Sequence, residues 1–159
     1  MVEIAHVRAG DARSVQIFAH LLAQYEESLP LDLRISDLEA ELQSLPERYA
    51  PPAAAMLLAL DNETAVGCVA IKALDSRTAE IKRLYVAPGA RRSGAGRALV
   101  GAAIAFARER SCERVVLDTE RERLNAAYRL YVSLGFRHCA PYAQVDYANP
   151  TFMELTFRA

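Results

Sequence analysis

The chain contains no tryptophan and only three cysteines and three histidines among its 159 residues. Cys68, Cys112 and Cys139 are widely spaced and form no CxxC pair, which indicates reduced thiols rather than a disulfide framework. The histidines are equally scattered, and no HExxH or comparable pair of ligands occurs. We therefore expect no metal site.

The sequence also lacks an excess of either charge and any long apolar run. Its 19 basic and 20 acidic residues leave a formal net charge of −1, so no overall basic field favours nucleic acid or an anionic membrane. The N-terminal segment does not have the layout of a signal peptide, and the apolar stretches are too short to span a membrane. We expect a single cytoplasmic domain over residues 1–159, with no nucleic-acid or membrane partner.

The first third of the chain predicts one strand and two helices. Residues 3–8 alternate as a strand, and Asp11 can cap a helix that runs to about residue 27. The run Ser36-Asp37-Leu38-Glu39 predicts a capping box, with the Ser36 hydroxyl at the start of a second helix that ends near Pro46.

The middle of the chain changes to strand periodicity and then alternates between strands and helices. Two strands at 56–60 and 65–74 are joined by a polar turn. The remaining elements are expected at 78–87 (strand), 94–110 (helix), 114–119 (strand) and 124–134 (helix). The helical crossover predicts parallel pairing of the strands on either side of it.

The tail alternates again over residues 136–142 and 151–158, which predicts two antiparallel strands and an edge that a homodimer can use. Together these elements predict an α/β (α+β) fold. We expect a mixed, mostly antiparallel sheet of six to seven strands with helices on both faces.

A glycine-rich loop separates the strand 78–87 from the helix that follows. Gly94 and Gly96 remove Cβ atoms where the backbone bends and can approach a ligand closely. The first N–H groups of the helix are unpaired and lie at the positive end of its dipole, so they suit an anion with several oxygens. Neither a Walker A loop nor a full GxGxxG motif is present. A nucleotide site and a plain tight turn remain alternatives.

Three motifs together resemble the GNAT superfamily of N-acetyltransferases. Arg-x-x-Gly-x-Gly at residues 91–96 resembles the family's pyrophosphate loop, and residues 80–88 resemble its fourth strand. The run Ala127-x-x-Leu130-Tyr131-x-x-Leu134-Gly135-Phe136 is similar to its fourth helix. The resemblance implies a GNAT-like acyl-CoA acyltransferase fold in which strands 78–87 and 114–119 splay apart.

The resemblance also implies acetyl-CoA as co-substrate. Backbone N–H groups of residues 92–97 would bind its diphosphate, and the backbone of residues 84–86 would lie along the pantetheine arm. Family members often carry an asparagine at the position of Leu124; Asn125 is one residue late and is expected to point about 100° away on a helix. The expected cofactor-binding residues are Leu84, Tyr85, Val86, Arg91, Arg92, Ser93, Gly94, Ala95, Gly96 and Arg97.

Tyr131 matches the family's general acid, which gives a proton to the departing CoA sulfur. The alternative is a helix tyrosine whose hydroxyl is bonded locally. Glu80 is the candidate base for the amine, which arrives protonated, although Glu80 can instead pair with Lys82. Asp118 is the rival base, and its competing role is to cap the turn before helix 124–134.

Residues 25–52 are expected to cover the acceptor side of the cleft. Their acidic side chains would attract a cationic amine, unless they simply form a solvated helix face. Tyr142 and Tyr147 can line the pocket or pack beside it. The sequence predicts an acetyltransferase that acts by direct attack of a primary amine from a small molecule, an amino acid or a peptide N-terminus. The alternative is a CoA-binding sensor or interaction module without turnover.

Overall fold

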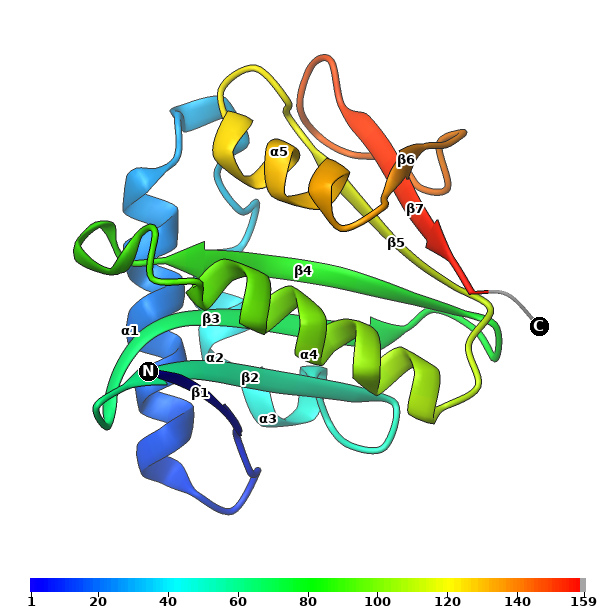
Figure 1. The fold of residues 1–159 in the computed structure, drawn as a ribbon. Coiled ribbons are helices and arrows are strands. Elements are labelled where there is room, and N and C mark those ends of the chain that lie inside the picture. The colour runs from blue at the N-terminus through cyan, green and yellow to red at the C-terminus, as the bar shows by residue number, and fades with distance from the viewer. Residues whose placement is uncertain (158–159) are drawn as a thin grey trace.

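The computed structural model describes residues 1–157 of the chain. Its strands form one sheet of seven in the order β1-β2-β3-β4-β5-β7-β6 (Figure 1). The elements are β1 (Val2–His6), α1 (Ala12–Ser28), a 3-10 turn (Leu31–Leu33), α2 (Leu38–Gln43), α3 (Leu45–Arg48), β2 (Ala54–Asp61), β3 (Thr64–Ala73), β4 (Thr78–Val86), a second 3-10 turn (Pro88–Ala90), α4 (Ala95–Glu109), β5 (Arg114–Thr119), α5 (Asn125–Ser133), β6 (Arg137–His138) and β7 (Thr151–Thr156).

The pairing of the strands confirms the predicted mixed sheet. Strands β1 to β4 form an antiparallel meander, and β5, β7 and β6 form a second antiparallel unit. The two units meet through β4 and β5, which run parallel because α4 crosses over between them. This junction is where the meander and the C-terminal part of the chain face each other.

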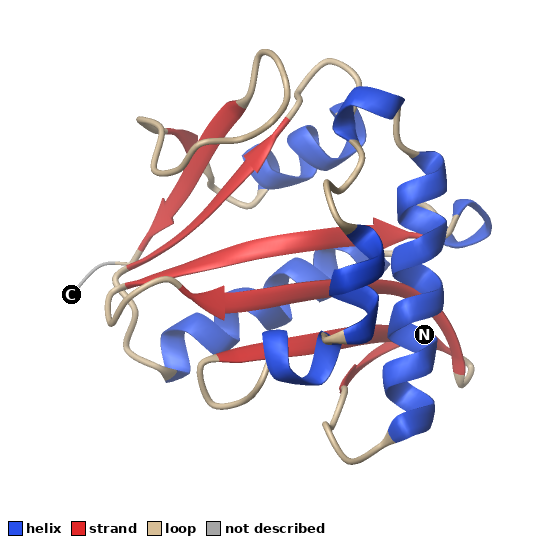
Figure 2. Ribbon diagram, turned by 180° about the vertical axis from the view of Figure 1, so that it is seen from behind, coloured by secondary structure: helices blue, strands red, loops and turns tan. Residues whose placement is uncertain are grey.

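Each face of the sheet carries its own apolar core. Leu99, Ala103 and Phe106 of α4 pack on one face, and α5 adds Tyr131 to the same cluster. On the opposite face, shown from that side in Figure 2, α1 and α3 bury Phe18 and other side chains against β2 and β3. Cys68 and Cys112 are buried and unpaired, and burial raises the pKa of the Cys68 thiol to about 12.

Strands β4 and β5 pair over only a short length. Their register contains Thr78↔Arg114, Ala79↔Val115 and Glu80↔Val116, and no pair follows. From this point the two strands diverge, which is visible as a V that opens toward α1 and α5 in Figure 1. The predicted splay of the central strands is therefore confirmed.

A β-bulge lies in β4 just beyond the last of these pairs. Arg83 has a φ of 63°, and the register with β3 changes from Ala70↔Lys82 to Cys68↔Tyr85. Residues four apart on a regular strand share a face, yet Ile81 packs in the α4 core and Tyr85 in the α1 core. The bulge therefore reverses which side chains of β4 face each side of the sheet.

Two local predictions were wrong at the second helix. Asp37, not Ser36, is the N-cap of α2, because the Asp37 carboxylate accepts a hydrogen bond from Ala40 N at 3.1 Å. The Ser36 hydroxyl instead donates to Asp146 at 2.9 Å. The helix ends at Gln43 rather than near Pro46, and Pro46 lies in the first turn of α3, where its missing N–H costs nothing.

The strand predicted at 136–142 is also much shorter than expected, since only Arg137–His138 pair with β7. Pro141 follows soon after, and it has no N–H to extend the ladder. The predicted strand 151–158 is found as Thr151–Thr156, and position 158 lies outside the described residues. Within residues 1–157, no helix is both long enough and apolar enough to cross a bilayer.

Candidate active site

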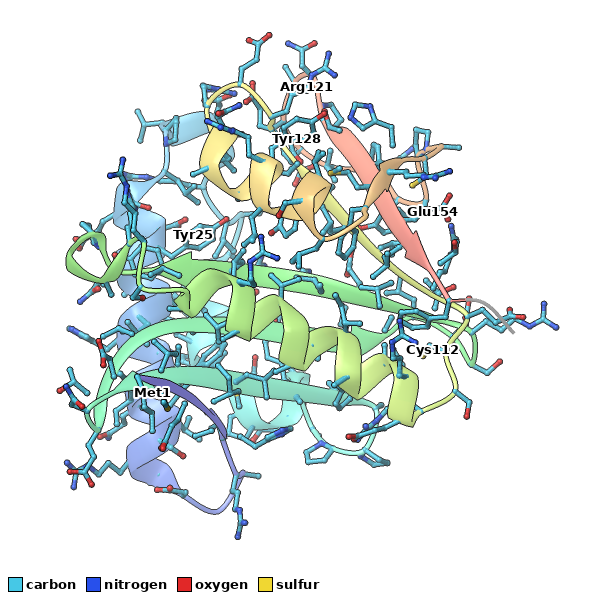
Figure 3. The ribbon with its side chains drawn as sticks, in the orientation of Figure 1. Met1, Tyr25, Cys112, Arg121, Tyr128 and Glu154 are labelled. Atoms are coloured by element: carbon cyan, nitrogen blue, oxygen red, sulfur yellow. The ribbon has the colours of Figure 1, made fainter. Side chains whose placement is uncertain are left out.

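A groove of about 800 Å³ opens where β4 and β5 separate. Its floor comes from the bulged half of β4, and its walls come from the C-terminal end of α1, the loop before α4 and the N-terminal part of α5. Tyr25 of α1, labelled in Figure 3, lies at the same end of β4. The groove has the size of a small-molecule or cofactor site.

The loop before α4 presents free N–H groups to this groove. Gly94 is the N-cap and has a φ of +89°, a conformation that L side chains rarely adopt. Ala95 N donates to Ser93 Oγ at 3.2 Å, whereas the N–H groups of Gly94, Gly96 and Arg97 find no hydrogen-bond acceptor within residues 1–157. These three donors stand at the positive end of the α4 dipole, so they can bind a phosphate group.

The two glycines of the loop act in different ways. A Cβ at Gly94 would meet nothing within 4 Å, so this position needs glycine for its backbone conformation alone. A Cβ at Gly96 would lie 3.2 Å from Leu130 Cδ2, so Gly96 allows α4 to pack closely against α5.

The structure brings the predicted cofactor-binding residues together along the floor and one wall of the groove, except for Ser93, which does not line it. The Tyr85 ring lies on the α1 side of the sheet, with its centroid 5.8 Å from that of Tyr25, which also lines the groove. Leu124 and Asn125 both line the groove, and the Asn125 amide donates to Arg121 O at 3.2 Å. The Asn125 amide is thus turned back onto the backbone of Arg121, and the expectation that it makes no contact of the family type with CoA stays a prediction.

Tyr131 of α5 lines the same groove as the loop before α4 and the open ends of the strands. Its side chain is only 5% exposed, and its ring packs against Phe136 at a centroid distance of 5.7 Å. Its hydroxyl makes no hydrogen bond to another described residue, and residues 1–157 contain no buried side-chain oxygen without a partner. The hydroxyl is therefore accessible from the groove, and burial of the ring raises its pKa above the ordinary value.

The two candidate bases occupy different depths. Glu80 is 7% exposed, does not line the groove, and accepts a hydrogen bond from the Tyr142 hydroxyl at 2.7 Å rather than forming an ion pair with Lys82. Asp118 lines the groove and accepts a hydrogen bond from the Tyr147 hydroxyl at 2.7 Å. Of the two tyrosines considered, Tyr147 therefore lines the groove, whereas Tyr142 packs beside it on Phe152.

The competing role predicted for Asp118 was wrong. The turn before α5 is capped by Glu120, whose carboxylate accepts from the N–H groups of Glu122 and Arg123 at 3.0 and 2.7 Å. The Asp118 side chain is consequently left for the groove.

Part of the expected acidic rim is bonded within the fold. Glu41 is 2% exposed and receives two hydrogen bonds of 2.8 Å from Arg83, and Asp32 receives a similar pair from Arg123 at 2.8 and 3.0 Å. Glu26 accepts from Ile35 N at 2.8 Å. These three carboxylates therefore help to hold residues 25–52 in place. Glu27, Asp37, Glu39 and Glu47 are exposed and form no ion pair within residues 1–157, so a rim that attracts a cation and a solvated helix face both stay predictions.

Sequence reasoning missed the cations at the open end of the strands. Lys82 and Arg83 both line the groove because the bulge follows Lys82 directly. Burial, and then the neighbouring charge of Arg83, lowers the pKa of Lys82. No sequence signal marked this bulge, since Arg83 is a residue type that rarely adopts a positive φ. No cluster of metal-ligating side chains is found in the described part of the chain.

Comparison with known proteins agrees with this geometry. Residues 16–136 match the model of the acetyltransferase (GNAT) family. An uncharacterized N-acetyltransferase of Schizosaccharomyces pombe is 35% identical over 140 residues, which cover 87% of this chain and 85% of that protein. The uncharacterized N-acetyltransferase YsnE of Bacillus subtilis is 32% identical over 111 residues, or 67% of this chain and 72% of that protein.

Solved structures share the fold. A GNAT-family acetyltransferase of Staphylococcus aureus superposes with a TM-score of 0.82 at 17% identity, covering 99% of this chain and 100% of that one. The PaiA N-acetyltransferase of Thermoplasma acidophilum, solved in complex with coenzyme A, gives a TM-score of 0.72 at 16% identity and 99% coverage of both chains. The chain therefore belongs to the GNAT family of N-acetyltransferases, enzymes that transfer an acetyl group from acetyl-CoA to an amine.

Proposed function

We propose that this enzyme transfers the acetyl group directly to the primary amine of a small molecule, with Tyr131 as general acid and without a metal ion. The observation that carries the proposal is the continuity of the groove. It runs from the free N–H groups at the start of α4, past the accessible Tyr131 hydroxyl, to the carboxylate of Asp118. One ligand can therefore bring its thioester to the place where a second ligand presents an amine.

The cofactor half of the groove supports binding of acetyl-CoA through the backbone. The N–H groups of Gly94, Gly96 and Arg97 would hold the diphosphate. Beyond Glu80 the edge of β4 that faces β5 has lost its partner strand, so its amide groups are available to the pantetheine arm. Arg91 and Arg92 add positive charge at the entrance.

The chemistry needs three proton transfers and one exchange of bonds. The ammonium of the acceptor gives a proton to a carboxylate, and the free amine attacks the thioester carbonyl carbon. The C–N bond forms, the C–S bond breaks, and the sulfur leaves with a proton from Tyr131. Burial keeps Tyr131 protonated at neutral pH, so it is available as the donor. A proton released from the acylated nitrogen restores the phenol.

Two carboxylates can accept the first proton. Asp118 lines the groove and can contact the ammonium directly, whereas Glu80 lies deeper and would act through a water molecule. We compare Glu80→Gln with Asp118→Asn by the pH dependence of kcat/KM. If a carboxylate is the base, kcat/KM should fall at low pH as that carboxylate is protonated, and its neutral variant should lose this fall. A fall at low pH that is kept in both variants would exclude Glu80 and Asp118 as the base.

The experiment that tests the function is release of free thiol from acetyl-CoA across a panel of primary amines, with binding of CoA measured separately by calorimetry. We expect amine-dependent thiol release together with formation of the N-acetyl product. Tight CoA binding without thiol release from any amine would favour a sensor that has lost turnover. Stronger thermal protection by ATP or NAD than by CoA would instead indicate a nucleotide site.

A further inference from the structure

Two opposite charges face each other across the opening between β4 and β5. Glu80 and Val116 form the last pair of the two parallel strands, and Lys82 and Asp118 each follow two residues later. Side chains two residues apart share a face, so both lie on the face covered by α1. Both line the groove, yet they are not ion-paired with each other. The diverging strands hold the two charges apart.

Lys82 differs from the other cations at this end of the groove. Arg83 is neutralised by Glu41, and Arg123 is paired with Asp32 and Glu120. Lys82 forms no ion pair or side-chain hydrogen bond with any residue in the range 1–157, although it is half-buried. The carboxylates of Glu80 and Glu41 lie near enough to favour the charged form of Lys82, but neither forms an ion pair with it. A partly buried cation without a contacting anion is costly, and an anionic group on a ligand would offset that cost.

The wall next to these charges is apolar. Leu29, Leu33 and Ile35 come from the segment after α1, and Tyr25 closes the wall from α1 itself. The Ile35 N–H is bound by Glu26 and the neighbouring Asp32 is clamped by Arg123, so the segment has a defined position over the groove. This wall suits an apolar side chain next to the two charges.

We propose that the acceptor is a free amino acid with an apolar side chain, an inference that rests on the proposed acetyl transfer. Its carboxylate binds Lys82, its amino group lies at Asp118, and its side chain packs on Tyr25, Leu29 and Ile35. A peptide N-terminus carries an amide in place of the carboxylate, and a simple amine carries neither. Both would leave Lys82 unpaired, so both are poorer acceptors.

The test uses three acceptors that share one side chain: phenylalanine, phenylalaninamide and phenethylamine. We expect thiol release with phenylalanine at a kcat/KM that exceeds the other two by about tenfold to a hundredfold, the range for a hydrogen bond to a charged group. Leucine and leucinamide repeat the comparison with a smaller side chain. Equal kcat/KM for the amino acid and its amide would overturn the assignment while acetyl transfer stands.

Lys82→Met removes the charge and keeps the length of the side chain. We expect it to raise KM for phenylalanine about tenfold or more, to change kcat little, and to abolish the preference over phenylalaninamide. Lys72→Met is the matched control. Lys72 lies on the neighbouring strand β3, opposite Glu80 in the register, and does not line the groove. An unchanged preference in Lys82→Met would remove Lys82 from acceptor recognition.

Binding separates this inference from the transfer reaction itself. Phenylalanine and phenylalaninamide are titrated calorimetrically into CoA-saturated wild-type enzyme and Lys82→Met. The inference is supported if wild-type enzyme binds phenylalanine more tightly than phenylalaninamide and Lys82→Met does not. If this result is found but no thiol is released, only the proposed acetyl transfer is contradicted. Equal affinity of wild-type enzyme for phenylalanine and phenylalaninamide would overturn the inference, whether or not thiol is released.

Discussion

The two halves of the groove are built in different ways. The cofactor half comes from two short stretches of chain, residues 84–97 and 124–131, and its main groups are backbone N–H donors at one helix terminus. The acceptor half is assembled from residues far apart in sequence, including Tyr25, Arg83 and Tyr147. A local motif can therefore identify the cofactor, whereas the acceptor depends on how distant segments fold together.

The halves also differ in how their charges are used. Arg91, Arg92 and Arg97 surround the loop and are exposed to solvent. At the proposed acceptor end, Arg83 and Glu41 form an internal pair, whereas Lys82 lines the groove without an ion pair. Changes in the cofactor half should mainly alter CoA binding, and changes in the acceptor half should alter either stability or acceptor choice.

The largest effect is expected where the halves meet, at Tyr131. Tyr131→Phe removes the proposed proton donor and should lower kcat by about 10²- to 10⁴-fold. CoA affinity, measured by calorimetry, should change little, because the ring that packs on Phe136 is kept. Tyr128→Phe is the control, since the Tyr128 hydroxyl bonds His138 at 2.8 Å and does not line the groove. A kcat that is unaltered in Tyr131→Phe would exclude it as the acid.

In the acceptor half, Glu41→Gln should destabilise the fold by about 3 kcal/mol, because it leaves the Arg83 charge uncompensated next to the core. Urea unfolding measures this loss. Glu41→Leu combined with Arg83→Met removes both charges and should recover much of the stability. A double variant no more stable than Glu41→Gln would contradict this account.

The same pair predicts a pH dependence. Burial of Glu41 opposes ionisation, but the hydrogen bonds and charge of Arg83 outweigh it, so the pKa in the folded state lies below its ordinary value of 4.5. The stabilisation is therefore present above pH 4.5 and is lost as the pH falls through the lower, folded-state pKa. The difference in unfolding free energy between wild type and Glu41→Gln should shrink across that range.

In the cofactor half, Gly94→Ala should cost about 1–2 kcal/mol, because it places a side chain at a left-handed φ. CoA binding should weaken with it, since the same backbone presents the N–H groups. Gly101→Ala in the middle of α4 meets no atoms within 4 Å and should be neutral or slightly stabilising. Equal stability and equal CoA affinity in the two variants would contradict the role given to Gly94.

The smallest effect is expected at the exposed arginines of the loop. Arg91→Gln should weaken CoA binding by about twofold to fivefold at low salt, the range for an exposed charge pair. The loss should fade as ionic strength rises, because salt screens exposed charges. Arg129→Gln is the matched control, since Arg129 is exposed on α5 and does not line the groove. A loss of CoA affinity that is independent of salt would point to a contact of another kind.

Much of the fold followed from local patterns. The alternation of strands and the crossover helix predicted the mixed sheet, because period and connection length are properties of short segments. The errors fell where two local choices compete. Ser36 and Asp37 are both good caps, and only the contact of Ser36 with Asp146 shows which one the helix uses.

The sequence by itself indicated the proposed cofactor half, because the glycines, the helix start and the Tyr131 motif lie in two short stretches of chain. Only the tertiary structure decided the acceptor half. The bulge at Arg83 reverses which side chains of β4 face each side of the sheet. Because β4 and β5 diverge, Lys82 and Asp118 lie on the same face without forming an ion pair. Glu41 forms an ion pair with Arg83 inside the fold. The physical reason is that burial and charge pairing depend on residues distant in sequence, so their outcome is set when the segments pack.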